Sequence, residues 1–151
     1  MQFNFVLIFL FCLHFIFLSN CVSNFKCVRG NCYNNNSVVE FKNGARYEGE
    51  YKKGKYHGLG KFTYANGDVY EGQFFAGIFQ GKGVFTYSDG SIYKGHFRNG
   101  EFDGKGKMDY PNGDTYEGDW LNGQKHGFGK YAFKSGIVQE GKFQNDKYIK
   151  K

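Results

Sequence analysis

Four glutamates are the first residues whose type and spacing suggest chemistry, because the intervals between them are multiples of 23 residues: Glu48, Glu71, Glu117 and Glu140. Two carboxylates can act as a general acid and a general base when they lie close enough to share a proton. If each interval contains two neighbouring strands, successive glutamates lie about 10 Å apart, at about 4.8 Å per strand. Lys94 also interrupts the row. We therefore interpret the glutamates as a solvated or backbone-capping ladder without a catalytic role.

Two histidines, His57 and His126, share one position of the same 23-residue interval and are candidate metal ligands or general bases. The equivalent positions hold Gln80 and Asp103, so the position does not require a histidine. The sequence lacks GxSxG, HExxH and phosphate-cradling glycine motifs, and its later serines lie in turn-like segments. These observations predict a protein that is not an enzyme and has no catalytic residue, no metal site and no cofactor.

The first twenty residues contain no Asp, Glu, Lys or Arg, and residues 5–18 form a nearly continuous apolar run of 14 residues. A membrane-spanning helix needs about 20 apolar residues, whereas the apolar part of an export signal has about 7 to 15. Residues 1–20 are therefore predicted to be a signal peptide. No Lys or Arg precedes the run, and an uncleaved anchor is the alternative.

The run ends in Leu18-Ser19-Asn20-Cys21, which resembles the lipobox of bacterial lipoproteins, whose cysteine receives the lipid. Asn20 departs from the Gly, Ala or Ser that usually precedes this cysteine. The resemblance implies lipid attachment at Cys21 and a membrane-anchored place in the cell envelope, whereas ordinary cleavage would give a secreted protein. Each buried CH₂ of a lipid chain contributes about 0.8 kcal/mol, so acylation would anchor the chain without a transmembrane helix.

Cys27 and Cys32 would remain after removal of the leader, with four residues between them. Gly30 and Asn31 lie in that interval and favour a tight turn. Because exported proteins fold in an oxidising compartment, we predict a disulfide between the two cysteines. A closed zinc site would need a second pair of Cys or His ligands, which the sequence does not offer.

The composition favours strands and turns over helices. The 151 residues include 18 Phe, 12 Tyr and 23 Gly but only one Pro, and 21% are aromatic. Charged residues make up only 23%, and aromatic residues occur along the whole chain, which argues against disorder. The lone Pro111 and the spacing of the glycines exclude collagen. The length fits one ordinary domain.

The glycines reveal an internal repeat of 23 residues. Gly49 begins a column that recurs every 23 residues within the segments YEGEY, YEGQF, YKGHF, YEGDW and QEGKF. Every glycine after Gly30 falls into one of five such columns. A stacked array of similar units is therefore expected, in which neighbouring units stabilise one another.

Each unit alternates with a period of two: Tyr47, Gly49 and Tyr51 are separated by charged residues. This pattern predicts two strands per unit, with one face of aromatic residues and glycine and one polar face. Pairs such as Asn66-Gly67 predict type I′ hairpin turns, and 52–58 predicts a longer turn at the other end. Glycines within strands leave room for rings from neighbouring strands and predict a strongly curved sheet. The predicted fold is all-β, an elongated and twisted antiparallel meander of successive β-hairpins.

The segments YEGEYKKGKYHGLGKF and YEGDWLNGQKHGFGKY resemble the MORN repeat (membrane occupation and recognition nexus). The resemblance covers about 41–151. Together with the apolar run and the lipobox, it gives the expected organisation: 1–20 as signal peptide, 21–40 as lipid-attachment cysteine, cysteine loop and degenerate capping repeat, and 41–151 as the array. The units of the array are expected at 47–69, 70–92, 93–115 and 116–138, with a partial unit at 139–151. Lys94 departs from the Glu of the YEG triplet, and Gln139 from its Tyr.

The net charge of +6 favours acidic partners. Nucleic acid is not an expected partner, because the aromatic residues belong to repeat columns and an exported protein rarely meets nucleic acid. MORN arrays have been proposed to bind phospholipids, and other members are protein–protein modules. The resemblance therefore implies a scaffold that binds an unknown protein, with anionic phospholipid headgroups as the alternative. An uncapped last strand would permit a homodimer. The expected binding residues are exposed aromatic side chains of a groove: Tyr47, Tyr70, Tyr93, Tyr116 and Trp120.

Overall fold

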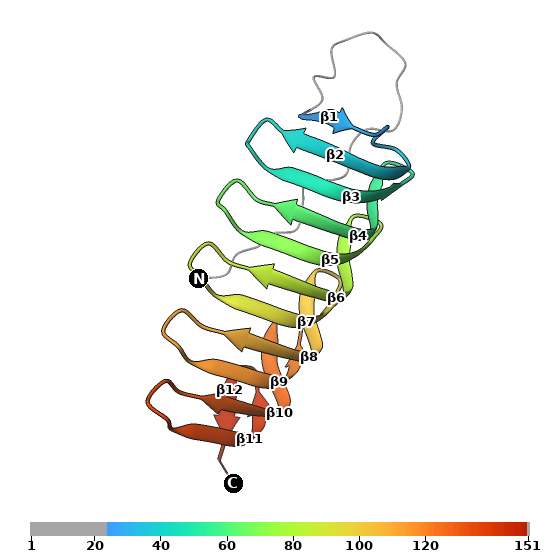
Figure 1. Ribbon diagram of the computed structural model, residues 1–151. Helices are drawn as coiled ribbons and strands as arrows, with labels where there is room; N and C mark the ends of the chain where they lie inside the picture. Colours follow the sequence, from blue (N-terminus) through green and yellow to red (C-terminus); the bar gives the residue numbers. More distant parts are fainter. Residues whose placement is uncertain (1–23, 151) are drawn as a thin grey trace.

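Each 23-residue unit forms two antiparallel strands, as the alternating pattern predicts, and the units join into a single sheet (Figure 1). The computed structural model describes residues 24–150, so the predicted signal peptide and Cys21 lie outside the described residues. The strands are β1 (Phe25–Arg29), β2 (Asn35–Phe41), β3 (Arg46–Lys52), β4 (Lys55–Thr63), β5 (Val69–Phe75), β6 (Ile78–Thr86), β7 (Ile92–Arg98), β8 (Glu101–Asp109), β9 (Thr115–Leu121), β10 (Gln124–Ala132), β11 (Val138–Gln144) and β12 (Lys147–Ile149).

The order of the strands in the sheet is their order in the chain, from β1 to β12, which confirms the predicted antiparallel meander of hairpins. The register brings glycines opposite one another on every strand from β3 to β11. Gly49 pairs with Gly60, Gly60 with Gly72, and the line continues without a break to Gly141. Two of the five glycine columns therefore form one continuous line across the middle of the sheet.

The prediction of type I′ turns at Asn66-Gly67 and its equivalent Asn112-Gly113 is wrong, whereas the pairs Asn99-Gly100 and Asn122-Gly123, at the opposite ends of the hairpins, have the two positive φ angles of that turn. Only Gly67 of the pair Asn66-Gly67 has a positive φ, and its N–H donates to the Tyr64 carbonyl, so the connection is a three-residue loop with glycine in the left-handed position. The loop forms because the Asn66 side chain accepts the N–H of Asp68 at 3.1 Å. The predicted long turn at 52–58 is also wrong. Lys53 and Gly54 both have positive φ, so the tight two-residue turn lies there.

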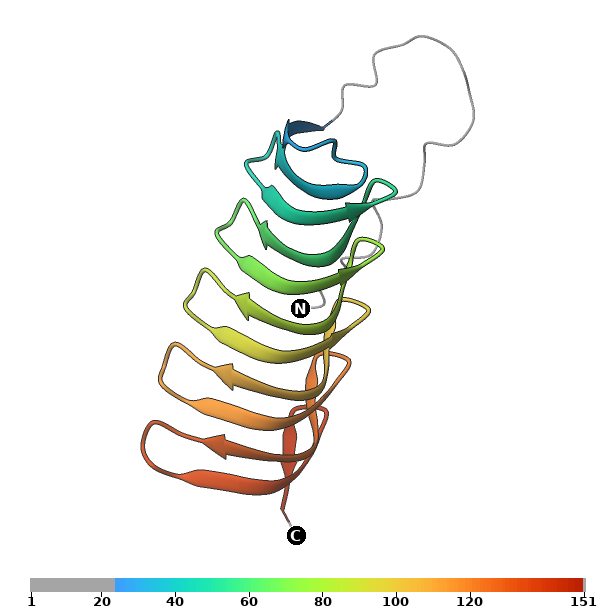
Figure 2. The same cartoon turned by 45° about the vertical axis from the view of Figure 1, so that its right-hand side comes forward.

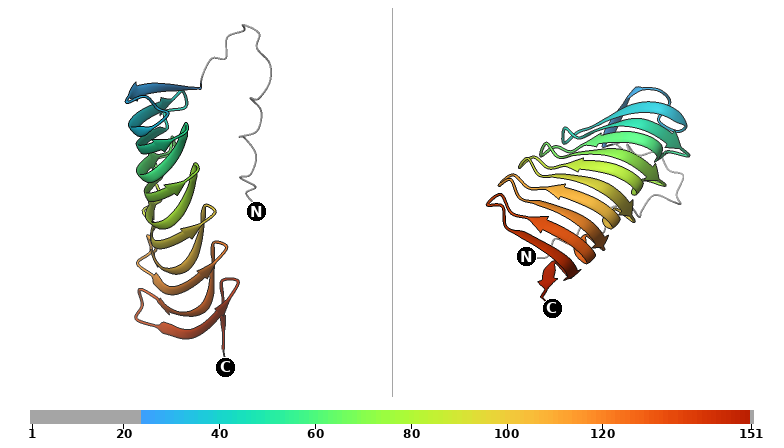
Figure 3. Two further views of the ribbon diagram at one scale, coloured as in Figure 1. Left: turned by 90° about the vertical axis from the view of Figure 1, so that its right-hand side faces the viewer. Right: turned by 60° about the horizontal axis from the view of Figure 1, so that its bottom comes forward.

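Strands in this sheet are curved rather than flat, as Figure 2 and both views of Figure 3 show. The sheet is a single layer, yet the side chains of Tyr47, Tyr70, Tyr93 and Tyr116 have no exposed surface. In one layer, full burial requires that the sheet curves around these side chains and that their neighbours cover them. The aromatic face is therefore the inner face of the curve, and the polar face is the outer one.

The glycine line provides the space for the buried tyrosines. A Cβ atom on Gly106 would lie 2.6 Å from the Tyr93 ring, and one on Gly95 would lie 2.7 Å from it. The ring therefore covers a glycine of its own strand as well as one of the next strand, whereas the sequence had suggested only rings from neighbouring strands. The Tyr93 hydroxyl donates to the His96 carbonyl oxygen at 3.0 Å. Equivalent bonds at 2.8 to 3.0 Å are made by Tyr47, Tyr70 and Tyr116.

A bulge next to the glycine line is closed by a side chain in most units. In β4, Gly58 and Leu59 have no partners on β3, and the freed Leu59 N–H donates to the Glu50 carboxylate at 2.9 Å. Gln73 accepts from Lys82 N–H and Asp119 from Phe128 N–H in the same way, each at 2.9 Å. The third unit has His96 here, whose Nδ1 lies 3.3 Å from the Lys105 carbonyl oxygen. This position of the repeat therefore contributes to the backbone hydrogen bonding of the sheet.

The first hairpin, β1 and β2, continues the sheet at its N-terminal end. Val39 pairs with Tyr47 of β3 and is 1% exposed, in the same position of the unit as Phe62. A disulfide joins Cys27 to Cys32 across the connection between the two strands. This hairpin thus covers the aromatic core of the first full unit.

Candidate functional site

The five aromatic residues that the sequence suggested as an exposed binding surface are buried. Tyr47, Tyr70, Tyr93 and Tyr116 are 0% exposed and Trp120 is 5% exposed. The prediction of their exposure is wrong because the sheet curves around them and further rings lie over them. Trp120 additionally donates its Nε1–H to the Gly106 carbonyl oxygen at 3.1 Å. These side chains form the core of the array.

Burial controls the ionisation of the core tyrosines, since a phenolate would lose its hydration. Desolvation raises the pKa of Tyr51 and of Tyr116 to about 12. It raises the pKa of Tyr47, Tyr70 and Tyr93 further above the ordinary value. The hydroxyl groups therefore stay protonated at neutral pH and remain hydrogen-bond donors to the backbone.

A second layer of aromatic side chains covers the tyrosines and is half-exposed. The Tyr56 ring stacks on Tyr47 with centroids 3.9 Å apart, and Phe79 stacks on Tyr70 at 3.7 Å. An open cavity of about 340 Å³ lies against this layer. We call it the aromatic groove; its lining includes Tyr56, Phe62, Tyr64, Ile78 and Phe79.

Sequence reasoning missed these groove residues. Alternation assigns Tyr56 and Phe79 to the same face as the core tyrosines, but it does not distinguish the first layer from the second. One clue was available: the core tyrosines are flanked by the glycines that leave them room, whereas Tyr56 and Phe79 lie close to the hairpin turns. Because the strands curve, side chains between the glycine line and the hairpin turns lie over the core tyrosines.

In the first three units, the position of Tyr56 holds an aromatic residue that stacks on the core tyrosine. In the fourth unit, Lys125 occupies this position. Its Nζ lies 5.3 Å from the centroid of the Tyr131 ring and 5.8 Å from those of Tyr110 and Tyr116. Its side chain is 16% exposed, and Nζ lies 3.8 Å from Asp146 Oδ1. The aromatic face is thus apolar in its first units and carries a half-buried cation in its last.

The polar face holds a larger open groove of about 1180 Å³ that extends from β5 to β11. The glycine line forms its floor, and charged side chains form its walls. Three of the four recurring glutamates, Glu71, Glu117 and Glu140, line it together with lysines. The fourth, Glu48, pairs with Arg29 and Arg46 at 2.8 and 3.0 Å. The structure therefore places the glutamates in an exposed ladder with basic neighbours.

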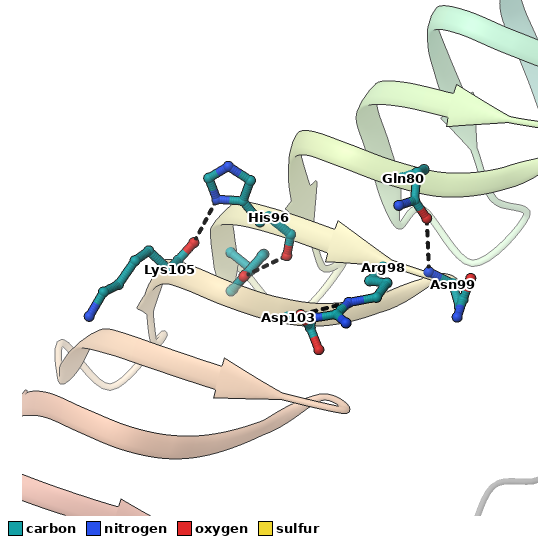
Figure 4. A network of polar contacts seen from close by, with 7 residues as sticks. Gln80, His96, Arg98, Asn99, Asp103 and Lys105 are labelled. Atoms are coloured by element: carbon teal, nitrogen blue, oxygen red, sulfur yellow. Dashed lines mark hydrogen bonds and ion pairs between the residues drawn. The ribbon is translucent and has the colours of Figure 1, made fainter.

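Polar contacts in the third unit differ from those in the others (Figure 4). The Arg98 guanidinium donates to the Asp103 carboxylate, and Asp103 is buried. Gln80 accepts the N–H of Asn99 at 3.2 Å. Asp103 and Gln80 occupy the position that holds histidine in two other units, and here they bind neighbouring groups of the sheet. Their contacts are structural and provide no catalytic arrangement.

Within residues 24–150, no group of three or more His, Cys, Asp or Glu side chains is placed to hold a metal ion. In the same part of the chain, no helix is long and apolar enough to cross a membrane. His57 lies beside Phe75 with ring centroids 5.4 Å apart, and His126 is partly buried in the equivalent position.

Comparison with known proteins gives one family. The MORN repeat family matches residues 47–69, 70–92, 93–115 and 116–138. No curated protein matches the sequence. Among solved structures, the chain is similar to the TCP domain of SAS-4 (dCPAP) from Drosophila melanogaster, in complex with a proline-rich motif of Ana2 (dSTIL). That match has 10% identity and a TM-score of 0.47, and it covers 85% of each chain.

A second solved structure is the wild-type TCP10 domain of Danio rerio CPAP in complex with a peptide of Danio rerio STIL. It shares 18% identity with a TM-score of 0.30, and the match covers 77% of this chain and 58% of that one. The family match spans four consecutive units and more than half of the sequence, and the glycines and aromatic residues of those units have the structural roles described above. The chain belongs to the MORN repeat family.

Proposed function

We propose that this chain is an exported, non-enzymatic scaffold that binds a protein partner through the aromatic groove. The observation that carries the proposal is a row of half-exposed aromatic side chains that lines a cavity of about 340 Å³. Contiguous apolar surface in a recess is typical of binding sites for protein segments or ligands. Aromatic side chains also contribute large contact areas at low cost in conformational entropy.

The shape and chemistry of the groove favour an extended segment with apolar side chains. Tyr64 and Tyr56 offer ring faces together with hydroxyl groups, which can bond to the backbone of a bound segment while the rings contact its side chains. The half-buried Lys125 further along the same face would pair with an acidic or carbonyl group of the partner. The groove itself therefore suits an apolar segment, and an acidic group of the partner would reach Lys125, which already lies near Asp146, only where the segment continues past the groove.

Photo-crosslinking from single positions tests this proposal. A benzophenone side chain in place of Tyr64 should give one dominant protein adduct in cells, and Ile78→Asp should remove that adduct because both residues line the groove. The matched control carries the same side chain in place of Phe128, which is 69% exposed and lines the polar groove. Equal adducts from both positions, or none from position 64, would refute the aromatic groove as the binding surface.

Export and lipid attachment at Cys21 form the second part of the proposal. The disulfide between Cys27 and Cys32 supports it, because such bonds persist in oxidising compartments and are rare in the cytosol. Mass spectrometry of the protein from its native membrane fraction should find a chain that begins at an acylated Cys21. A chain that starts at Met1 would contradict export, and a soluble chain cut elsewhere would contradict the lipid anchor.

A further inference from the structure

On the polar face, charges alternate from strand to strand except at three consecutive positions, Val84, Lys94 and Lys107. The register gives the cross-strand row Glu48, Lys61, Glu71, Val84, Lys94, Lys107, Glu117, Lys130 and Glu140. Each lysine elsewhere in this row faces glutamates on both neighbouring strands. Lys94 instead faces Val84 on one side and Lys107 on the other. Like charges directly opposite each other destabilise a sheet, so this pair needs a compensating group.

The whole outward face of β7 is basic beyond Ile92, with Lys94, His96 and Arg98 in alternate positions. The equivalent strand β5 presents Glu71 and Gln73 there, and β9 presents Glu117 and Asp119. The difference is confined to one unit of the array. A local reversal of charge on an otherwise balanced face points to an acidic ligand at that place.

Three basic groups in this patch are available to a ligand. Arg98 is paired with Asp103, Lys105 with Asp119 at 2.6 Å, and Lys107 with Asp109 at 2.7 Å. Within the described part of the chain, Lys82 and Lys94 form no ion pair, and His96 lies directly opposite Lys82. All three side chains line the polar groove beside Gly83 and Gly95, which are paired with each other in its floor.

We propose that the polar groove at the third unit is a binding site for a compact, soluble ligand that carries phosphate groups, held by Lys82, Lys94 and His96. Phosphate fits better than carboxylate, because lysine ammonium groups act as separate point charges around a tetrahedral anion, whereas a planar carboxylate is matched best by the arginine fork. The recessed glycine floor leaves room for the ligand between the three side chains.

The flanking charges limit the size of the ligand. Glu71 on β5 and Glu117 on β9 border the patch, and four strand spacings place them about 19 Å apart. An anionic membrane or a long polyanion along the groove would meet these carboxylates and Glu140. A small phosphorylated molecule would touch only the basic unit. The site is separate from the aromatic groove, which lies on the opposite face of the sheet.

Calorimetric titration of the full-length chain with myo-inositol hexakisphosphate, at about 0.15 M salt to screen distant charges, tests the site. Lys94→Glu introduces the residue that three other units carry at this position, so the sheet should remain folded while affinity falls at least tenfold. Lys82→Gln should weaken binding severalfold. The matched control is Lys130→Gln, which removes a lysine from the same groove between two glutamates and should change affinity less than twofold.

Several results would overturn the proposal. One is the absence of binding by the unmodified chain, and another is an equal loss in Lys82→Gln and Lys130→Gln, which remove the same charge and would then indicate attraction by net charge alone. A parallel measurement uses vesicles that contain phosphatidylglycerol. Binding to these vesicles that is sensitive to Lys94→Glu, without binding of the soluble probe, would identify a membrane ligand and refute a compact soluble one. Tyr64→Asp, in the aromatic groove, should leave binding of the probe unchanged.

Discussion

The two faces of the sheet differ in how closely the units resemble one another. On the aromatic face, a buried tyrosine occupies the same position in all four full units and makes the same hydrogen bond to the backbone three residues later. On the polar face, the neighbouring positions hold Glu, Glu, Lys and Glu in one column and Glu, Gln, His and Asp in another. The fold therefore constrains the inner face tightly and the outer face loosely.

This difference indicates at which positions of the array a binding function can arise. A residue that fills the space over the glycine line cannot change without loss of packing, because its ring contacts the backbone of two strands. In the column that holds Glu48, Glu71, Lys94 and Glu117, the outer side chains face solvent and their cross-strand neighbours, so one unit can change its charge there without a change of fold. Lys94 is such a change.

The largest effect is expected from alkaline pH, which ionises tyrosine side chains that the aromatic face buries. Burial raises the pKa of Tyr51, Tyr64 and Tyr116 to about 12, whereas a tyrosine in an unfolded chain titrates near pH 10. The tyrosines of the unfolded chain therefore lose their protons at a lower pH than those of the folded chain. The free energy of unfolding keeps its full value below about pH 10 and falls as the pH rises towards 12. Circular dichroism and tyrosinate absorbance should change together. Ionisation of these tyrosines near pH 10 in a folded chain would contradict their burial.

A methyl group on the glycine line should be the most damaging single substitution. Gly106→Ala places a Cβ within 2.6 Å of the Tyr93 ring, which is enclosed on all sides, and should lower the free energy of unfolding by about 3 kcal/mol. Gly77→Ala is the control: no atom lies within 4 Å, and only its positive φ of 93° should cost about 1 kcal/mol. Urea unfolding measures both. Equal losses would mean that conformation, and not the packed ring, explains the glycine line.

Removal of one hydroxyl group should have an intermediate effect. Tyr93→Phe leaves the half-buried His96 carbonyl oxygen without this donor and should lower the free energy of unfolding by about 1.5 kcal/mol. Tyr64→Phe removes the hydroxyl of a half-exposed groove residue and should change it by less than about 0.5 kcal/mol. If the two substitutions had the same effect in chemical denaturation, the distinction between core and groove tyrosines would fail.

The smallest changes in the free energy of unfolding are expected from substitutions on the polar face. The same substitution should have opposite signs in two different units. Lys94→Glu replaces a lysine opposite Lys107 and should raise the free energy of unfolding by about 0.5 kcal/mol in the absence of ligand. Lys130→Glu places a third carboxylate between Glu117 and Glu140 and should lower it by a similar amount. Thermal unfolding at low salt would reveal the difference, and high salt should reduce it. A loss of stability in Lys94→Glu would contradict the unfavourable lysine pair.

Much of the fold could be predicted from the sequence because it is local. Glycine columns at 23-residue spacing and alternation around Gly49 specify two strands per unit, and short connections leave little choice but an antiparallel meander. The turns were harder to predict. Asn66-Gly67 has the residues of a type I′ turn, but the Asn66 side chain bonds to Asp68 and favours a three-residue loop. The tight turns lie at Lys53-Gly54 and its equivalents, which include Asn99-Gly100 and Asn122-Gly123, so the Asn-Gly signal for them was present in the later units of the repeat.

By itself, the sequence determined the repeat, its two strands, the composition of each face and the membership of the MORN repeat family. Only the tertiary structure decided which aromatic residues are core and which line the groove, because alternation defines a face whereas burial depends on the curvature of the sheet and on rings from other strands. The tertiary structure likewise decided that Lys82, Lys94 and His96 lie near one another in the polar groove. Their proximity follows from the register between β6 and β7, which the pairing of Gly83 with Gly95 sets across the sheet.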